Sequence, residues 1–314
     1  MLLRACLALF FVLVASQTAL TAQSRDSVRL NRTIELLDQG EAVFGIISGD
    51  RSLHNARSLA RSGLDFIVVD MEHGGSWDAE ILQTFLLGMT DKRAIVDNGN
   101  LQMAVTPMVR IPTNGREMNS FVVKQALDMG AFGILFPWIE NREEALNAVR
   151  SMRYAQPVSS MYKDPPGYRG RSPSIASWYW GLSSSEYYGR ADLWPTNPRG
   201  NLLAMLEIES PLGLENLEDI VTTPGVGVIF VGPNDVATGM GYGDTVSPLV
   251  EEAIQRVLAS CLRNNVPCGI TTSAETVQQR IREGFKVVTV GGDGGITPGT
   301  ARTLDLGLTE AGRR

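Results

Sequence analysis

The chain has 314 residues, 44% of them hydrophobic and 20% charged, so it is long enough to bury a substantial core. Its 34 acidic residues outnumber its 28 basic ones, for a formal net charge of -6, and no run of lysine or arginine is long enough to follow a phosphate backbone. Nucleic acid is therefore excluded as an expected partner. Two histidines exclude a histidine-rich zinc cage, and three cysteines provide neither a disulfide framework nor a cysteine-based metal site.

The N-terminal segment has the pattern of an export signal. Arg4 precedes an apolar run over residues 5–15, which is too short to span a bilayer. Small residues follow, and cleavage is expected after Ala22. We therefore expect residues 1–22 to be a signal peptide, the mature protein to be exported (periplasmic or secreted), and no stable membrane span. The alternative is a buried N-terminal helix.

After this segment, short apolar runs alternate with helical patterns. Apolar runs bounded by turn residues predict strands at 43–47, 66–69, 105–109, 133–136, 202–208, 228–231, 268–271 and 287–290. Apolar residues three and four apart predict helices at 52–62, 78–89, 120–129, 142–152, 212–221, 247–264, 274–283 and, more weakly, 300–306. This alternation predicts a parallel sheet covered by helices, and eight units favour a closed barrel over an open sheet.

The prediction is an α/β protein with a single (β/α)8 TIM-barrel domain at 23–314. The stretch 157–200 interrupts the pattern, because it is rich in Ser, Pro, Tyr, Trp and Gly and is too long for a plain connection. We expect it to be an active-site insertion or lid. Cys261 and Cys268 are expected to be core thiols, although export would permit them to pair.

Functional residues of such barrels follow the carboxyl ends of the strands. Here, acids, an imidazole and a guanidinium stand at four predicted strand ends: Asp70, Glu72, His73, Arg110, Glu209 and Asp235. We interpret these ends as the mouth of an active site.

Two of these acids have the character of metal ligands. Glu209 and Asp235 would project from neighbouring strands, and carboxylate oxygens suit Mg²⁺ or Mn²⁺. Two protein ligands leave positions open for a chelating substrate. The alternative for Glu209 is an acid stabilised by the dipole of a helix that begins near Pro211.

The remaining candidates have acid–base or electrostatic roles. His73, with Asp70 and Glu72 nearby, is a candidate general base, and the alternative is a hydrogen-bonded loop histidine. The guanidinium of Arg110 suits a carboxylate or a developing enolate oxygen, or else a salt bridge at the mouth. Asp128 is expected at a helix end where the dipole disfavours an acid, which suggests a partner such as Arg110 or His73.

Several segments, taken together and in this order, resemble the HpcH/HpaI aldolase family. They are VDMEHG at 69–74, VRIP at 109–112, KQALDMGA at 124–131, ES at 209–210 with LENLEDI at 214–220, and VGPNDV at 231–236. The resemblance runs from about Val43 to the eighth strand.

The resemblance implies a metal-dependent class II aldolase on a barrel of the phosphoenolpyruvate/pyruvate type, like the 4-hydroxy-2-oxoheptanedioate and 2-keto-3-deoxy sugar acid aldolases. Such an enzyme cleaves a 4-hydroxy-2-oxo acid to pyruvate, or a similar 2-oxo acid, and an aldehyde. The implied cofactor is Mg²⁺ or Mn²⁺, with Co²⁺ as a third candidate. The resemblance also implies a homo-oligomer, either a hexamer or a trimer.

The same resemblance assigns roles to the residues at the mouth. Glu209 and Asp235 match the metal ligands. Arg110 matches the arginine that steadies the keto oxygen. His73, helped by Asp70, matches the base that exchanges the proton of the 4-hydroxyl.

Other residues match the substrate side of the family site or depart from it. Asp128 matches a supporting acid of the catalytic network. Ser210, Gly232 and Pro233 match positions at the substrate carboxylate, although Pro233 has no amide hydrogen to donate. Glu207 stands where relatives commonly have Gln, and its extra negative charge beside the substrate would alter the pKa of nearby carboxyls or the choice of substrate.

Two other functions stay open. One is a lyase similar to the citrate lyase β subunit, for which extra basic residues would be expected to bind a nucleotide tail. The other is an exported relative that binds a metal and an organic acid without turnover.

Overall fold

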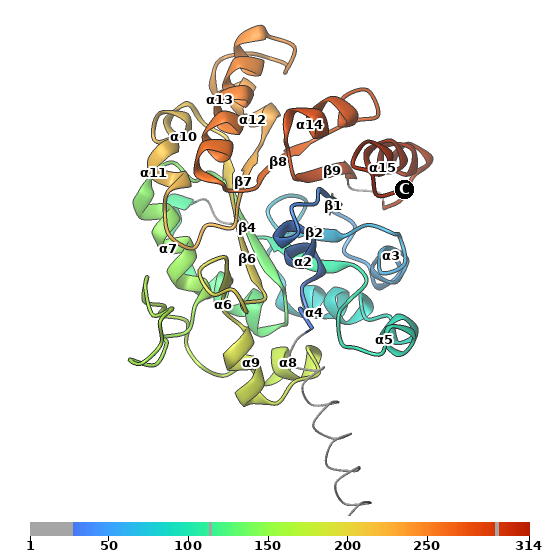
Figure 1. Cartoon of the computed structure of the whole chain (residues 1–314), viewed down its shortest axis with the longest axis vertical. Coiled ribbons are helices and arrows are strands. Elements are labelled where there is room, and N and C mark those ends of the chain that lie inside the picture. Colours follow the sequence, from blue (N-terminus) through green and yellow to red (C-terminus); the bar gives the residue numbers. More distant parts are fainter. Residues whose placement is uncertain (1–27, 113–114, 293–294) are drawn as a thin grey trace, which may run out of the picture.

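Eight parallel strands close into a barrel. The computed structural model describes residues 28–112, 115–292 and 295–314 (Figure 1). The barrel strands are β1 (Val43–Ser48), β2 (Phe66–Asp70), β3 (Thr106–Arg110), β4 (Gly133–Phe136), β6 (Leu202–Ile208), β7 (Val228–Val231), β8 (Cys268–Thr271) and β9 (Val287–Gly292). Neighbours pair in this order, with β9 pairing back to β1, so the predicted (β/α)8 barrel is confirmed. A short ninth strand, β5 (Leu193–Trp194), pairs with the start of β6.

Helices surround the strands on the outside (Figure 1). They are α3 (Leu53–Leu59), α4 (Ala79–Gly88), α5 (Lys92–Asn98), the 3-10 helix η1 (Gly115–Glu117), α6 (Ser120–Asp128), α7 (Arg142–Met152), α10 (Pro211–Glu215), α11 (Leu217–Val221), α12 (Pro233–Gly239), α13 (Pro248–Asn264), α14 (Val277–Glu283) and α15 (Pro298–Glu310). The helix predicted at 212–221 is two short helices, and α15 is longer than predicted.

Local sequence explains where several helices begin. The side chain of Asp78 accepts hydrogen bonds from the amides of Glu80 and Ile81, and Asn141 caps α7 in the same way. These caps satisfy amides that have no partner within the helix. Proline occupies the first turn of α12, α13 and α15, where its missing N–H costs no hydrogen bond.

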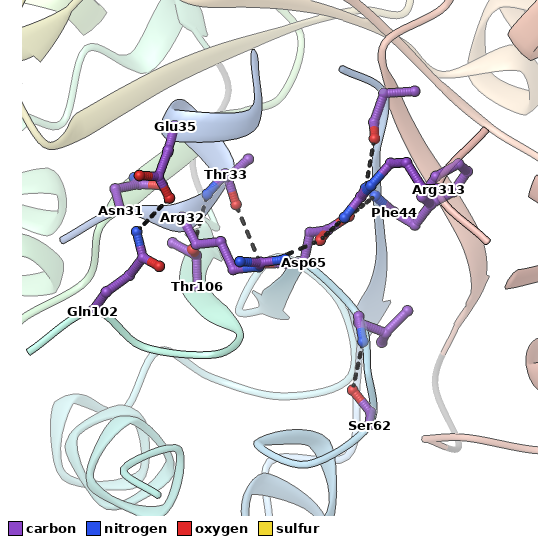
Figure 2. Close-up of polar contacts among 12 residues, drawn as sticks. Asn31, Arg32, Thr33, Glu35, Phe44, Ser62, Asp65, Gln102, Thr106 and Arg313 are labelled. Carbon is purple, nitrogen blue, oxygen red and sulfur yellow. Dashed lines mark hydrogen bonds and ion pairs between the residues drawn. The ribbon is translucent and has the colours of Figure 1, made fainter. Parts of the chain in front are cut away.

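One end of the barrel is closed by a helix that the sequence did not predict, α2 (Arg32–Asp38). Three of its apolar residues join the cluster that fills the barrel interior: Ile34, Leu36 and Leu37. Polar contacts tie α2 to the strand starts, where Thr33 meets Thr106 (Figure 2). Beside them, the buried carboxylate of Asp65 is bound by Arg313 at 2.7 and 2.8 Å. The strands therefore begin at this closed end, and their carboxyl ends lie at the opposite, open end.

The segment 157–200 lies on the side of the strand starts, not over the mouth. It connects the end of α7 to the start of β6, and α7 has returned the chain to the closed end. The indole of Trp194 donates to Asp38 of α2 at 3.2 Å, and the carbonyl of Gly200 accepts from Arg29 at 2.6 Å. The expectation of a lid over the active site is therefore wrong, because the segment starts where α7 returns the chain to the closed end and its last residues are hydrogen-bonded there to Asp38 and Arg29.

This segment packs on the same core as the barrel and forms no separate unit. It contains α8 (Ser174–Tyr179) and α9 (Ser184–Arg190). Trp180 stacks on Phe132 with 4.2 Å between ring centroids. At its base, the fully buried Arg153 and Asp192 form an ion pair at 2.7 Å. Aromatic packing and one buried ion pair thus attach it beside β4.

Two further expectations concern thiols and membranes. Cys261 and Cys268 are free and buried, with their sulfurs 2.7 Å apart, which confirms them as core thiols. Across residues 28–112, 115–292 and 295–314, no helix has the length and apolar character needed to cross a membrane. The signal peptide expected at 1–22 lies outside the described residues.

Candidate active site

An acid and an arginine form the centre of the open end. Asp70 ends β2 and Arg110 ends β3, and the two residues are register partners in the sheet. The guanidinium of Arg110 donates to both carboxylate oxygens of Asp70, at 3.1 and 2.8 Å. Burial raises the pKa of Asp70, but the hydrogen bonds and charge of Arg110 outweigh it, so this pKa lies below its ordinary value. Asp70 is therefore a fixed anion that orients Arg110.

His73 stands on the loop that follows Asp70. Its backbone amide donates to the Asp70 carboxylate at 3.4 Å, and Nε2 of its ring lies 3.4 Å from Glu72 Oε2. The same Glu72 oxygen is 3.1 Å from Nε of Arg110. Burial, together with the charges of Asp70 and Asp235, raises the pKa of Glu72 against the opposing charges of Arg110 and His73. Asp70 thus holds the backbone of His73, whereas Glu72 contacts its ring.

Glu207 is the most deeply buried acid of the site. It lies near the end of β6, and its Oε1 is 3.8 Å from Nη1 of Arg110, beyond hydrogen-bond distance. Its Oε2 is buried and has no hydrogen-bond partner among the described residues. Burial, then repulsion from Glu209, raises the pKa of Glu207 well above its ordinary value. Glu207 is therefore a buried carboxyl whose ionisation the site disfavours.

Glu209 follows β6 and has one oxygen already occupied. Its Oε2 accepts a hydrogen bond from the backbone amide of Trp138 at 2.8 Å. Its Oε1 lies against Gly232, where a Cβ would come within 2.8 Å of that oxygen. Burial raises the pKa of Glu209 to about 7, the Trp138 amide opposes the shift, and the charge of Asp235 adds to it. Asp235, in the first turn of α12, is therefore close enough to act on Glu209 electrostatically.

The open end thus gathers five acidic side chains near the guanidinium of Arg110. The acids are Asp70, Glu72, Glu207, Glu209 and Asp235. In the part of the chain that the structure describes, no group of three or more His, Cys, Asp or Glu side chains is arranged to hold a metal ion. An ion held by two acids would take its remaining ligands from substrate or water.

One predicted residue lies elsewhere. Asp128 ends α6 at the closed end of the barrel, and its carboxylate binds the buried Arg169 at 2.6 Å. Arg169 also donates to the hydroxyl of Tyr187 in the segment 157–200. The expected pairing of Asp128 with Arg110 or His73 is therefore wrong, because α6 carries Asp128 away from the strand ends.

The three predicted residues at the substrate carboxylate lie at helix starts. Ser210 caps α10, where its hydroxyl accepts from the amide of Gly213 at 3.0 Å and donates to Glu140 at 2.8 Å. Gly232 and Pro233 open α12 beside Glu209. The hydroxyl of Ser210 is thus engaged in the fold, while Gly232 borders the acidic cluster directly.

Two residues of the site were not predicted. Trp138 follows β4 and holds Glu209 through its amide, with its own backbone at a φ of 54°. Arg51 follows β1 and donates to the carbonyls of Asp70 and His73. The rule that placed the other candidates after strand ends would have found both residues if it had also been applied to the first and fourth strands.

Comparison with known proteins identifies the family. The family model described as HpcH/HpaI aldolase/citrate lyase matches residues 50–297. The chain belongs to this family. The 5-keto-4-deoxy-D-glucarate aldolases of Escherichia fergusonii and Salmonella arizonae are each 33% identical to it over 250 residues, covering 79% of this chain and 85% of theirs.

Solved structures agree with this assignment. An HpcH/HpaI aldolase/citrate lyase family protein from Burkholderia cenocepacia superposes with a TM-score of 0.67 at 30% identity, covering 83% of this chain and 91% of that one. This member of the HpcH/HpaI family is a carbon–carbon lyase of the aldolase type acting on small molecules.

Proposed function

We propose that this protein cleaves a 4-hydroxy-2-oxo acid by a retro-aldol reaction, giving pyruvate or a similar 2-oxo acid and an aldehyde. A divalent cation, Mg²⁺ or Mn²⁺ with Co²⁺ as a third candidate, would be its cofactor. The observation that carries the proposal is that Arg110, bound by the carboxylate of Asp70, lies at the same barrel mouth as an acidic cluster centred on Glu209. The similarity to 5-keto-4-deoxy-D-glucarate aldolases supports a hydroxylated sugar acid as the substrate class.

The residues present fit a divalent cation. Glu209 is buried, repelled by Asp235 and left with Oε1 facing Gly232 while Trp138 holds Oε2. A cation shared by Glu209 and Asp235 would remove that repulsion, and hard oxygen ligands suit Mg²⁺ or Mn²⁺. When bound, such an ion draws electron density from a chelated 2-oxo acid.

The side chains around that position account for the remaining chemistry. Cleavage breaks the C3–C4 bond, so the 4-hydroxyl must lose its proton and the keto oxygen must accept negative charge. Arg110, held by Asp70, presents its positive charge to that oxygen. His73 takes the hydroxyl proton as the carbon–carbon bond breaks, and a proton added at C3 completes the 2-oxo acid.

The substrate side completes the proposal. We assign substrate binding to Arg110, Glu207, Ser210, Gly232 and Pro233. Glu207 places a buried carboxyl next to Arg110 whose ionisation is disfavoured, so it suits a neutral polar group of the substrate at that point rather than a second anionic group.

The deciding experiment measures pyruvate release from 4-hydroxy-2-oxo acids, 5-keto-4-deoxy-D-glucarate among them, with and without a chelator. Asp235→Ala should lose both Mn²⁺ binding and turnover, whereas His73→Ala should keep Mn²⁺ binding and lose turnover. Asp97→Ala, at an exposed ion pair on α5, is the matched control. Unchanged Mn²⁺ affinity in Asp235→Ala would contradict the ligand assignment, and a wild-type protein that binds Mn²⁺ and pyruvate without turnover would be a binding protein.

We also propose that the mature protein is exported and forms a homo-oligomer, a hexamer or a trimer. The export proposal depends on the pattern at residues 1–22, and the oligomer follows from the family resemblance. Cell fractionation with N-terminal sequencing, and light scattering of the purified protein, test the two proposals separately. A cytoplasmic protein that keeps Met1, or a monomer at micromolar concentration, would contradict them.

A further inference from the structure

Arg51 joins two loops at the mouth of the barrel. It lies between the end of β1 and the start of α3, and its side chain reaches the loop after β2. Its Nε donates to the carbonyl of Asp70 at 2.7 Å, and its Nη2 donates to the carbonyl of His73 at 2.5 Å. Both carbonyls belong to the loop that carries the candidate general base.

The loop is shaped around this guanidinium. Gly74 and Gly75 follow His73 with φ values of 76° and 150°, a backbone that other residues rarely adopt. A Cβ on Gly75 would lie 3.4 Å from Nη1 of Arg51. The two glycines therefore let the chain turn closely past the arginine.

The backbone around His73 is held from two sides. The carboxylate of Asp70 accepts the amides of Glu72 and His73, at 3.0 and 3.4 Å, while Arg51 binds carbonyls of the same loop. The ring of His73 is 68% exposed. With so little packing around the ring, its position depends mainly on where the backbone is fixed.

We propose that Arg51 is a positioning residue that fixes the loop at 70–75 and thereby the imidazole of His73. This inference rests on the proposed function, in which His73 exchanges the proton of the 4-hydroxyl. Arginine suits the role because one edge of its planar guanidinium presents two donors in fixed geometry to two carbonyls. Lysine, with a single flexible ammonium, would hold the loop less firmly.

The test compares Arg51→Met and Arg51→Lys with the control Arg93→Met, which removes an exposed arginine paired to Asp97 on α5. We expect Arg51→Met to lower kcat for retro-aldol cleavage by about 10- to 100-fold, the usual scale for a misplaced catalytic group. KM and the Kd for Mn²⁺ should change less than about twofold, because the loop holds no proposed metal ligand. Arg51→Lys should lose less activity than Arg51→Met.

Two further measurements separate positioning from general damage. Hydrogen exchange of the amides in 71–75 should become faster in Arg51→Met and stay unchanged in the control. In a His73→Ala background, Arg51→Met should cost little additional activity, because its effect acts through the imidazole. An equal loss of kcat with and without His73, or unchanged exchange in 71–75, would overturn the inference. Absence of turnover in the wild type would instead contradict the proposed function, and the exchange measurement would still decide whether Arg51 holds the loop.

Discussion

Glu207→Gln should stabilise the metal-free protein. The carboxyl of Glu207 is buried, one oxygen lacks a partner, and the guanidinium of Arg110 is too distant to donate a hydrogen bond. The pKa of Glu207 is higher in the folded protein than in the unfolded chain, so the folded protein binds the proton of this carboxyl more tightly. The free energy of unfolding therefore falls as pH rises above the unfolded pKa of about 4.3. Glutamine keeps the shape of the side chain and removes the charge, so this loss disappears.

The size of the gain follows from the cost of charging a buried carboxyl. Each unit by which folding raises a pKa costs about 1.4 kcal/mol once the pH lies above the folded-state pKa. The long contact with Arg110 offsets part of this cost, but the raised pKa of Glu207 shows that burial and the repulsion from Glu209 outweigh it. For a chain of this size, we expect thermal unfolding to shift upward by about 2–4 °C for each kcal/mol gained.

Thermal melts at pH 7 and pH 5, after removal of metals with a chelator, measure this effect. The gain should be larger at pH 7, because the unfolded chain ionises this carboxyl at that pH while burial opposes its ionisation in the fold. Glu215→Gln, at an exposed position on α10, should change stability by less than about 0.5 kcal/mol. A lower melting temperature for Glu207→Gln at pH 7, or a gain equal at the two pH values, would refute the reasoning.

Three other changes probe the site and its scaffold. Gly232→Ala should weaken Mn²⁺ binding by at least about tenfold in calorimetry, because the added Cβ would press on the carboxylate of Glu209. An unchanged Kd for Mn²⁺ would contradict this prediction. Arg153→Met should leave Asp192 as an unpaired buried charge and so lower the free energy of unfolding by about 3–5 kcal/mol, measured by denaturant titration. A loss of less than about 1 kcal/mol would show that this ion pair contributes little to stability. Because the pKa of Asp70 is lowered in the fold, its ionised form stabilises the protein above the unfolded pKa, and this stabilisation is lost as pH falls. The wild type should therefore be more stable than Asp70→Asn at neutral pH, and the difference should shrink below about pH 4. A difference that stays constant with pH would contradict this prediction.

The sequence by itself determined the barrel and the end of it where chemistry occurs. Strands buried on both faces read as continuous apolar runs, so β4, β6, β7 and β8 were predicted at their observed bounds. Parallel strands bring their carboxyl ends to one side, so their positions in the sequence already place Asp70, Arg110 and Glu209 at the same end of the barrel. Short helices such as α2 and α12 were not predicted, because one or two turns give too little periodicity.

Only the tertiary structure decided which charged groups meet. The segment 157–200 was expected over the mouth, yet the return of α7 fixes it at the closed end. Asp128 binds Arg169 of that segment, 41 positions away in the sequence. Arg51 binds the carbonyl of His73, 22 positions away. Hydrophobic periodicity specifies which face of an element is buried, whereas partners of charged side chains depend on distances that arise only when loops and helices pack together.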